Sequence, residues 1–297
     1  MPGHSHGPDH RCVSGMLPRR NLMLGVTLAG SLAVASASGP AASAEPKPLR
    51  IGGTGMALAT IRTISKAFEA SESDIAVEVL PSLGTGGGLA AVTAGAIDLA
   101  LSARPLNDTE RGKGLESRVY ARTPLAFVTH PSAGIDRISL SHVTLIFSGG
   151  VTTWPDGGLI RLIRREPSDA DWSTLRGVSQ DMARAVEIAL GRPGLMTVAT
   201  DQENADALER LKGSFGMLSV GQMHAEARRL TPLALDDVMP NVHELKTGRY
   251  SLSRSLYAVW HVQARTEVKR FLAFLRSEQA DTILTGLGHI ALSGGDP

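Results

Sequence analysis

Hydrophobic positions between residues 49 and 106 follow two different periods. Segments at 49–51, 75–80 and 97–101 are typical of strands, and in the second the apolar residues Ile75, Val77 and Val79 alternate along the chain. Between the first two runs, apolar residues fall at helical spacing with charged residues on the other side, at Leu58, Ile61, Ile64 and Phe68. An Ala/Leu/Val-rich segment that ends at Gly95 predicts a second helix. The order β-α-β-α-β predicts a parallel sheet with right-handed crossovers.

The same patterns continue to the end of the chain. Strands are expected at 125–128, 159–163, 215–220, 233–238 and 249–260. Helices are expected around 143–147, 182–189, 205–211, 268–275 and 283–284. No internal repeat or long linker separates these elements. The sequence therefore predicts an α/β protein whose two lobes are joined by extended crossings of the chain.

Two glycine-rich turns follow strands and precede helices. They are Gly52-Gly53-Thr54-Gly55 and Gly84-Thr85-Gly86-Gly87-Gly88. Such turns of a parallel sheet emerge at its carboxyl edge, where open α/β sheets bind ligands. Glycines let the backbone approach a ligand, and the helix N-termini present unpaired N–H groups that favour an anion or a carbonyl-type acceptor. Tight β–α connections without a ligand are the alternative interpretation.

Residues 1–44 have the layout of an export signal. The pair Arg19 and Arg20 precedes an apolar run to about Val34, and small residues lead to an A-x-A site that ends at Ala44. The paired arginines suggest the twin-arginine route, and cleavage near Ala44 is expected. An uncleaved anchor is the alternative, although the run is short for a membrane span.

Composition and charge change little in this picture. The chain is 42% hydrophobic and 20% charged, with a formal net charge of +1. Removal of residues 1–44 leaves 27 basic residues (30 − 3) and 28 acidic residues (29 − 1), a net charge of −1. No nucleic-acid partner is therefore expected. The only cysteine, Cys12, leaves with the signal, so neither a disulfide nor a thiolate metal site is expected afterwards.

Candidate chemistry is confined to a few polar positions. Arg164 and Arg165 follow an apolar strand, and arginine offers a planar set of donors suited to carboxylates and oxyanions. Salt bridges to nearby carboxylates are the alternative. Asp169 and Asp171 could suit a hard cation or could simply be solvated on a loop. Trp154 could wall a cleft or pack within its loop. Motifs of hydrolases and P-loop proteins are absent from the sequence.

The order of these motifs resembles that of the periplasmic phosphate-binding proteins of ABC importers, which are type II solute-binding proteins. The specific segments are SARPL at 102–106, IFSGGVTTW at 146–154 and YSLSRSLY at 250–257. The resemblance implies two α/β lobes, a two-stranded hinge and closure on an oxyanion. It also implies a periplasmic, non-enzymatic monomer that has no cofactor and serves the membrane subunits of an ABC importer.

The resemblance also implies where the lobes and the crossings lie. Residues 45–125 and 255–297 would form the first lobe, and residues 126–254 the second. The crossings would lie near 126–129 and 253–259.

Site residues carried over from the family match this sequence only in part. The first turn would contribute Thr54, Gly55, Met56 and Ala57, with Met56 where the family has a hydroxyl. The second would contribute Thr85, Gly86 and Gly87. Ala103 falls where phosphate binders have a carboxylate, and Ser102 and Arg104 flank it. Arg165 is retained, but Asp169-Ala170-Asp171 replaces a hydroxyl-rich Ser-Gly-Thr, and two carboxylates would repel phosphate unless screened or protonated.

The sequence therefore predicts an exported protein that binds a small anionic solute, phosphate or another oxyanion. One alternative is a family member that has lost phosphate binding and acts as a scaffold or signalling protein, or that binds a different small solute. A hydrolase on an α/β scaffold is the other alternative, and the absence of a nucleophile motif disfavours it.

Overall fold

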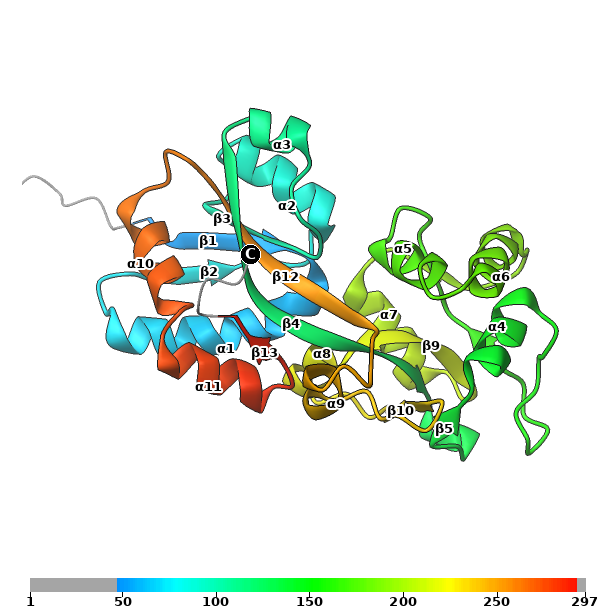
Figure 1. Ribbon diagram of the computed structural model, residues 1–297. Helices are drawn as coiled ribbons and strands as arrows, with labels where there is room; N and C mark the ends of the chain where they lie inside the picture. Colours follow the sequence, from blue (N-terminus) through cyan, green and yellow to red (C-terminus); the bar gives the residue numbers. More distant parts are fainter. Residues whose placement is uncertain (1–46, 293–297) are drawn as a thin grey trace, which may run out of the picture. The chain divides into compact units, whose positions relative to one another are not determined.

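A computed structural model describes residues 47–292, which belong to one compact unit (Figure 1). The predicted export signal and its cleavage site lie outside the described residues, as does Cys12.

The main sheet has the strand order β2-β1-β3-β12-β4-β9-β6, with β10 and β13 also paired to β4. Its strands are β1 (Leu49–Gly53), β2 (Val77–Val79), β3 (Leu99–Ser102), β4 (Leu115–Thr129), β6 (Arg161–Leu162), β9 (Ser214–Ser219), β10 (Thr231–Pro232), β12 (Ser253–His261) and β13 (Ile290–Ala291). Two small sheets pair β5 (Arg137–Ile138) with β11 (Ala234–Leu235), and β7 (Arg164–Arg165) with β8 (Thr197–Val198).

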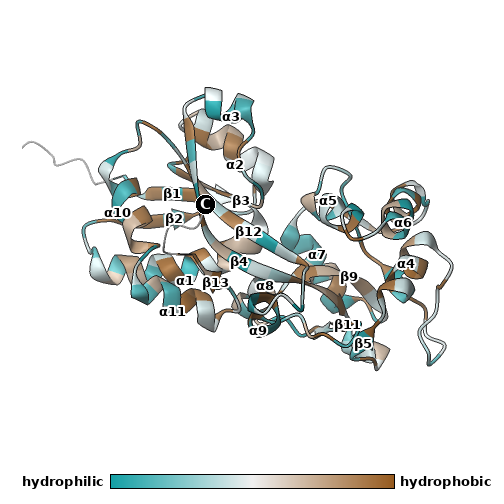
Figure 2. Ribbon diagram, in the orientation of Figure 1, coloured by the Kyte–Doolittle hydropathy of each residue, from teal (hydrophilic) through white to brown (hydrophobic). Residues whose placement is uncertain are grey.

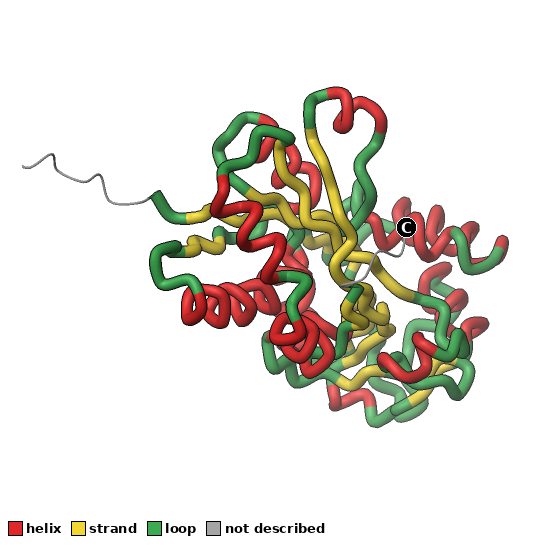
Figure 3. Tube along the Cα trace, turned by 60° about the vertical axis from the view of Figure 1, so that its left-hand side comes forward, coloured by secondary structure: helices red, strands yellow, loops and turns green. Residues whose placement is uncertain are grey.

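Helices flank these strands, as the red and yellow segments of Figure 3 show. They are α1 (Gly55–Ser71), α2 (Gly84–Thr93), α3 (Asp108–Gly112), α4 (Leu140–Ser148), α5 (Ala170–Arg176), α6 (Gln180–Gly191), α7 (Asp201–Arg210), α8 (Val220–Ala225), α9 (Val242–Lys246), α10 (Thr266–Phe274) and α11 (Glu278–Gly286), with a short 3-10 helix at Pro131–Ala133. The apolar colouring follows the strands and the inner faces of the helices (Figure 2).

The first lobe is built on the parallel unit predicted from the sequence. Strand β1 pairs in parallel with both β2 and β3. Because side chains alternate along a strand, Leu99 and Leu101 join a core with α1, α10 and α11, whereas Ala100 joins the core under α2. Helices α2 and α3 accordingly lie on one side of these strands, and α1 and α11 on the other (Figure 1).

The second lobe is organised around β4 and β9, which pair antiparallel from Leu125 to Thr129. Its main core contains an aromatic cluster in which Phe215 contacts Phe127, Phe147 and Trp154 at centroid distances of 5.8 to 6.3 Å. A further apolar cluster lies on α7 and α8. These strands and helices form the two-lobed α/β architecture that the sequence predicts.

The crossing between the lobes lies earlier along the chain than predicted. Strand β4 pairs with β12 up to Pro124 and with β9 from Leu125 onward. The predicted crossing at 126–129 therefore lies within the sheet of the second lobe. On the return path, the Leu125 N–H donates to the Leu252 carbonyl at 3.0 Å, immediately before β12. The division of the chain into lobes at residues 125 and 254 remains a prediction.

Several other elements differ from their predictions. The strand predicted at 125–128 is the end of β4, whose first half carries too many polar residues for an apolar run. Residues 233–238 contribute only the short β11 and an isolated bridge, because Asp236 and Asp237 have positive φ angles of 47° and 65°. Asp169 and Asp171, predicted on a loop, instead cap and begin α5.

Residues 47–292 lack two features that would bear on function. No helix in this range combines the length and apolar character that crossing a membrane requires. The same range contains no group of three or more His, Cys, Asp or Glu side chains able to hold a metal ion. The sequence interpretation of Asp169 and Asp171 as cation ligands therefore gains no support.

Candidate ligand-binding cleft

A cavity of about 770 Å³ lies between the lobes, where four helices begin. Helices α1 and α2 reach it from the first lobe, and α5 and α7 reach it from the second. Helix N-termini carry unpaired N–H groups and a positive dipole end, so this cavity favours anions. Its lining residues are Thr54, Met56, Ser82, Leu83, Gly84, Thr85, Gly86, Gly87, Ala103, Arg104, Arg165, Glu166, Pro167, Ser168, Asp169, Ala170, Ser173, Arg176, Ala199, Thr200, Asp201 and Arg254.

The N-terminus of α2 faces the cleft, and its first N–H, that of Gly84, donates to the Ser82 hydroxyl at 3.4 Å. Leu83 precedes the helix and provides no side-chain hydrogen bond. The Thr85 hydroxyl accepts from the Ala103 N–H at 3.1 Å, which leaves its own proton available for a ligand. A Cβ added to Gly86 would meet nothing within 4 Å. The first turn of α2 therefore offers N–H groups and one hydroxyl to the cavity.

Gly88 has a packing role instead. A Cβ on Gly88 would lie 2.7 Å from the Cα of Gly53, which has a φ of +131°. This glycine pair thus lets α2 pack directly on β1. The glycine-rich stretch has two functions: Gly88 positions the helix, and Gly86 keeps its N-terminus open.

The N-terminus of α1 is already occupied by a carboxylate from the other lobe. Asp201 Oδ2 accepts from the Met56 N–H at 2.9 Å and from the Thr54 hydroxyl at 3.2 Å. The neighbouring Gln202 amide donates to the Gly55 carbonyl at 2.9 Å. Thr54 itself forms no side-chain cap for α1. A carboxylate therefore provides the cap, from a residue 145 positions away from Met56.

Arg165 is the buried centre of the charged residues in the cleft. Its Nε and Nη2 donate to Asp169 Oδ2 at 3.0 and 2.6 Å, its Nη2 also donates to Asp201 Oδ1 at 3.0 Å, and its Nη1 donates to the Thr200 carbonyl. Burial lowers the pKa of Arg165, but Asp201 and Asp169 outweigh that effect and raise it. Arg165 is therefore a permanently charged residue whose donors are already engaged.

The two aspartates predicted to face a ligand are paired instead. Asp169 accepts the Asp171 N–H at 2.8 Å as the N-cap of α5, in addition to its bonds to Arg165. Asp171 Oδ1 accepts from Arg254 Nη2 at 2.7 Å, and both residues are only 8% exposed. Burial and the charge of Asp169 raise the pKa of Asp171 to about 6. Arg254 Nε is buried without a partner among the described residues.

The other predicted residues separate into lining and supporting positions. Arg104 lines the cleft but pairs with Glu110 at 2.7 Å. Ser102 is buried, and its hydroxyl donates to the Arg104 carbonyl at 2.6 Å, so it shapes the turn. Ala57 is buried within α1 and does not line the cavity, and neither Gly55 nor Asp171 is among its lining residues.

Asp201, Gln202 and Arg254 were not predicted as site residues. Arg254 lies within the YSLSRSLY segment that supported the family resemblance, so a signal for it existed. Asp201 carries no local signal, because it begins an ordinary polar helix.

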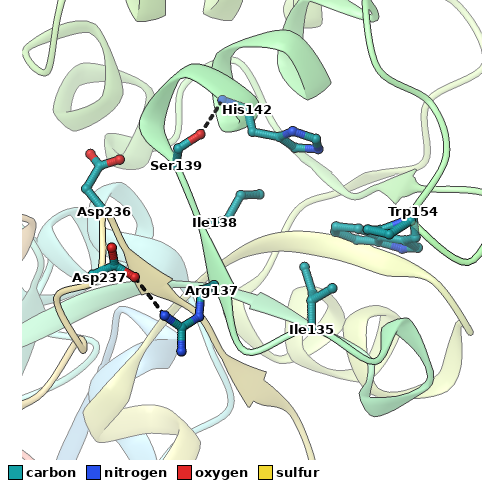
Figure 4. A pocket seen from close by; sticks show the side chains of 9 residues that line it. Ile135, Arg137, Ile138, Ser139, His142, Trp154, Asp236 and Asp237 are labelled. Atoms are coloured by element: carbon teal, nitrogen blue, oxygen red, sulfur yellow. Dashed lines mark hydrogen bonds and ion pairs between the residues drawn. The ribbon is translucent and has the colours of Figure 1, made fainter.

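A separate cavity of about 470 Å³ lies in the second lobe (Figure 4). Trp154 forms part of its wall, and Arg137 at its rim donates to Asp237 at 2.9 Å. Trp154 is 3% exposed, and its Nε1 donates to the Gly213 carbonyl. Trp154 thus packs within the second lobe and does not line the interlobe cleft.

Comparisons with known proteins agree with this architecture. The PBP (periplasmic binding protein) superfamily domain matches residues 34–279. The phosphate-binding protein PstS of Bacillus subtilis is 24% identical over 299 residues, with 93% of this chain and 96% of that protein covered.

Solved structures give the same fold at low identity. A Clostridium perfringens ABC transporter substrate-binding protein with bound phosphate has a TM-score of 0.70 at 17% identity, over 83% of this chain and all of the other. A phosphate transport receptor of Vibrio cholerae gives 0.59 at 20% identity, over 82% and 99%. The periplasmic molybdate-binding protein of Azotobacter vinelandii gives 0.57 at 14%, over 82% and 98%.

The family match covers far more than half of the chain, and the fold comparisons agree with it. Its members are solute-binding proteins, which confirms the prediction that this protein is not an enzyme. The chain belongs to the PBP superfamily and has the type II periplasmic binding protein fold.

Proposed function

We propose that this protein captures a small oxyanion in the interlobe cleft and delivers it to the membrane subunits of an ABC importer. The observation that carries the proposal is the N-terminus of α2, which opens onto the cavity together with the Thr85 hydroxyl and beside Arg165 and Arg254. Export to the periplasm and action as a monomer belong to the same proposal. The export signal predicted at residues 1–44 supports the first of these.

Charge in the cleft favours an anion only modestly. Four arginines line the cavity, Arg104, Arg165, Arg176 and Arg254, against three carboxylates, Glu166, Asp169 and Asp201. Several of these charges already pair with one another. The donors that remain for a ligand are therefore the N–H groups of Thr85 and Gly86 in the first turn of α2 and the Thr85 hydroxyl.

The relatives indicate which oxyanions to test first. The Bacillus subtilis relative is a phosphate-binding protein, and the Azotobacter vinelandii protein binds molybdate. Tetrahedral oxyanions of this kind match the N–H groups of a helix N-terminus. Phosphate is the first candidate, and sulfate and molybdate follow.

A thermal-shift and calorimetric screen tests the proposal. A ligand at a hundred times its dissociation constant stabilises the folded state by about 2.7 kcal/mol. Phosphate, sulfate, molybdate, phosphonates and carboxylates form the panel. We expect one of them to bind, and we expect Thr85→Val to weaken that binding by about tenfold, because one hydrogen bond to a charged group is lost.

Thr93→Val is the matched control, because Thr93 lies on the same helix and its hydroxyl donates to the Leu89 carbonyl. Its binding should equal that of the parent. Equal affinities for the Thr85 and Thr93 variants would place the ligand elsewhere.

A scaffold or signalling role is the second candidate function. It is favoured by the ion pairs that engage Arg165 with Asp169 and Asp201, and Asp171 with Arg254. A folded protein that shows no shift with the whole panel would support this role.

A further inference from the structure

The contact between α7 and α1 places a carboxylate where an oxyanion would bind. Asp201 uses one oxygen for the Met56 N–H and the Thr54 hydroxyl, and its other oxygen for Arg165. These are a helix N–H, a hydroxyl and a guanidinium, the same kinds of donor that hold an oxyanion. We propose that Asp201 is an internal competitor that sets the anion affinity of the cleft by occupying one half of the anion site.

The position of Asp201 is built into the packing of both helices. A Cβ on Gly55 would lie 2.3 Å from Gln202 Oε1 and 2.9 Å from the Cβ of Asp201. Glycine at this position therefore allows α7 to approach α1 closely. The Asp201 side chain is 14% exposed, so the contact is largely shielded from solvent.

Helix α7 does not need Asp201 for its own stability at this end. Its N-terminus is closed by a capping box, in which the Thr200 hydroxyl accepts from the Glu203 N–H at 3.1 Å and Glu203 caps Thr200 in return. A carboxylate in the first turn of α7 could therefore remain in solvent at little cost. It instead reaches across to the other lobe, which identifies α1 and Arg165 as its partners.

The negative charge of Asp201 therefore lowers the affinity of the cleft for anions. An anion that enters the half of the cleft formed by α2 meets the negative charge of Asp201, and an anion that uses all of the donors must displace it. Removal of this charge should therefore raise the affinity for a dianion. This inference rests on the proposed function for the location of the site, and it identifies the residue that limits binding there.

The experiment compares inorganic phosphate binding, by titration calorimetry at neutral pH, in the parent protein, Asp201→Ala and Asp201→Asn. Asp201→Ala vacates the site, and Asp201→Asn keeps the shape without the charge. We expect phosphate to bind at least tenfold more tightly to Asp201→Ala than to the parent, with Asp201→Asn in between. Asp181→Ala, which removes an exposed carboxylate of α6 outside the cleft, should match the parent.

Gly55→Ala tests the same contact if Asp201→Ala fails to fold. The added methyl group pushes Gln202 and Asp201 away from α1 but leaves every charge in place. We expect tighter phosphate binding than in the parent for this variant as well. Unchanged or weaker binding in both the Asp201 and the Gly55 variants would overturn the inference.

The two proposals fail in distinguishable ways. Binding to the parent without improvement in the variants overturns the role of Asp201 and keeps the proposed function. Binding only to the Asp201 variants supports the competition and rejects oxyanion capture by the natural chain. Absence of binding in every protein overturns both.

Discussion

Asp171 and Arg254 form a buried ion pair beside the cleft. Each is 8% exposed, and their charged atoms are 2.7 Å apart. Arg254 lies on β12, near the return crossing, whereas Asp171 lies in the first turn of α5. The pair therefore connects the strand that runs between the lobes to a helix that begins at the ligand cavity.

We predict that Asp171→Ala lowers the free energy of unfolding by about 3–5 kcal/mol, because it leaves the Arg254 guanidinium buried without its counter-charge. Urea unfolding measures this change. Asp181→Ala is the control, because the Asp181 side chain is 74% exposed and pairs with Arg184 on the same helix. Loss of that exposed pair should cost about 0–1 kcal/mol. Equal losses in the two variants would contradict the prediction.

Individual site residues could be predicted from the sequence only where a local motif marked them. Thr85 and Gly86 follow a strand and begin a helix, and the structure places both at the cleft. The partners of Arg165 were harder to predict. Asp169 is close in sequence, but Asp201 is 36 residues away from Arg165, and its contact with Met56 depends on how the two lobes meet. No single-sequence pattern encodes such a contact.

At the scale of elements, two glycines of α2 have different roles, because Gly88 packs against β1 and Gly86 lies at the cleft. We predict that Gly88→Ala destabilises the protein by about 1–3 kcal/mol, because the new methyl group would meet the backbone of Gly53 at 2.7 Å. Gly86→Ala is the matched change on the same helix, and nothing lies within 4 Å of its added Cβ. Its stability should be unchanged or raised by about 0.4–1 kcal/mol.

The binding of these two variants gives a second measurement. If a ligand contacts the first turn of α2, then Gly86→Ala should weaken oxyanion binding while its thermal stability is kept. Thermal unfolding and calorimetry on the same samples separate the two effects. A Gly86→Ala variant with the affinity of the parent would show that the ligand does not approach this backbone.

Helices and strands were predictable where hydrophobic residues recurred at one clear spacing, helical or alternating. The alternation at 75–80 and the helical spacing from Leu58 to Phe68 correspond to β2 and α1. The first half of β4 was missed because polar residues such as Arg118 and Arg122 interrupt the apolar pattern. Helix α5 was missed because seven residues are too few to show a helical period.

At the scale of the whole molecule, a buried histidine lies where the two lobes meet near the crossing. His289 is fully buried, and its Nε2 forms a hydrogen bond with the Thr60 hydroxyl of α1 at 3.0 Å. Its ring also packs against Gly221 of α8, where an added Cβ would be 2.1 Å from the ring. The Gly221 N–H in turn donates to the Thr123 hydroxyl of β4 at 3.0 Å. This group of contacts links α1, α8 and the crossing strand.

Burial, with a further contribution from the charge of His224, lowers the pKa of His289 from 6.5 to about 4. The folded state therefore holds the neutral ring, and the unfolded state takes up a proton at a higher pH. The stability from this group is fully present above pH 6.5 and is lost as the pH falls through about 4, a change of about 3 kcal/mol.

The buried aspartates change the stability of the protein with pH in the opposite direction to His289. Burial raises the pKa of Asp171 from 3.8 to about 6 and also raises the pKa of Asp201. Their stabilising contribution is present below pH 3.8 and is lost as the pH rises through the folded pKa, which for Asp171 is about 6. Between pH 4 and 6 the contribution of His289 therefore opposes those of Asp171 and Asp201, and the stability of the natural chain should depend on pH less steeply than the aspartates alone would make it.

We predict that His289→Gln removes the contribution to stability that opposes those of the aspartates. With the histidine contribution gone, the free energy of unfolding should fall by about 3 kcal/mol more than in the parent as the pH rises from 4 to 6, because only the aspartate contributions remain. Asp171→Asn should change the slope in the opposite direction, so that over the same range its stability rises by about 3 kcal/mol relative to that of the parent. Urea unfolding at half-unit pH steps measures all three profiles. If the two variants were shifted from the parent by constant amounts, with parallel profiles, these buried groups would not control the pH response. Slopes that differ from that of the parent in opposite directions would show that the residues at the junction and in the cleft together set the acid stability of the whole molecule.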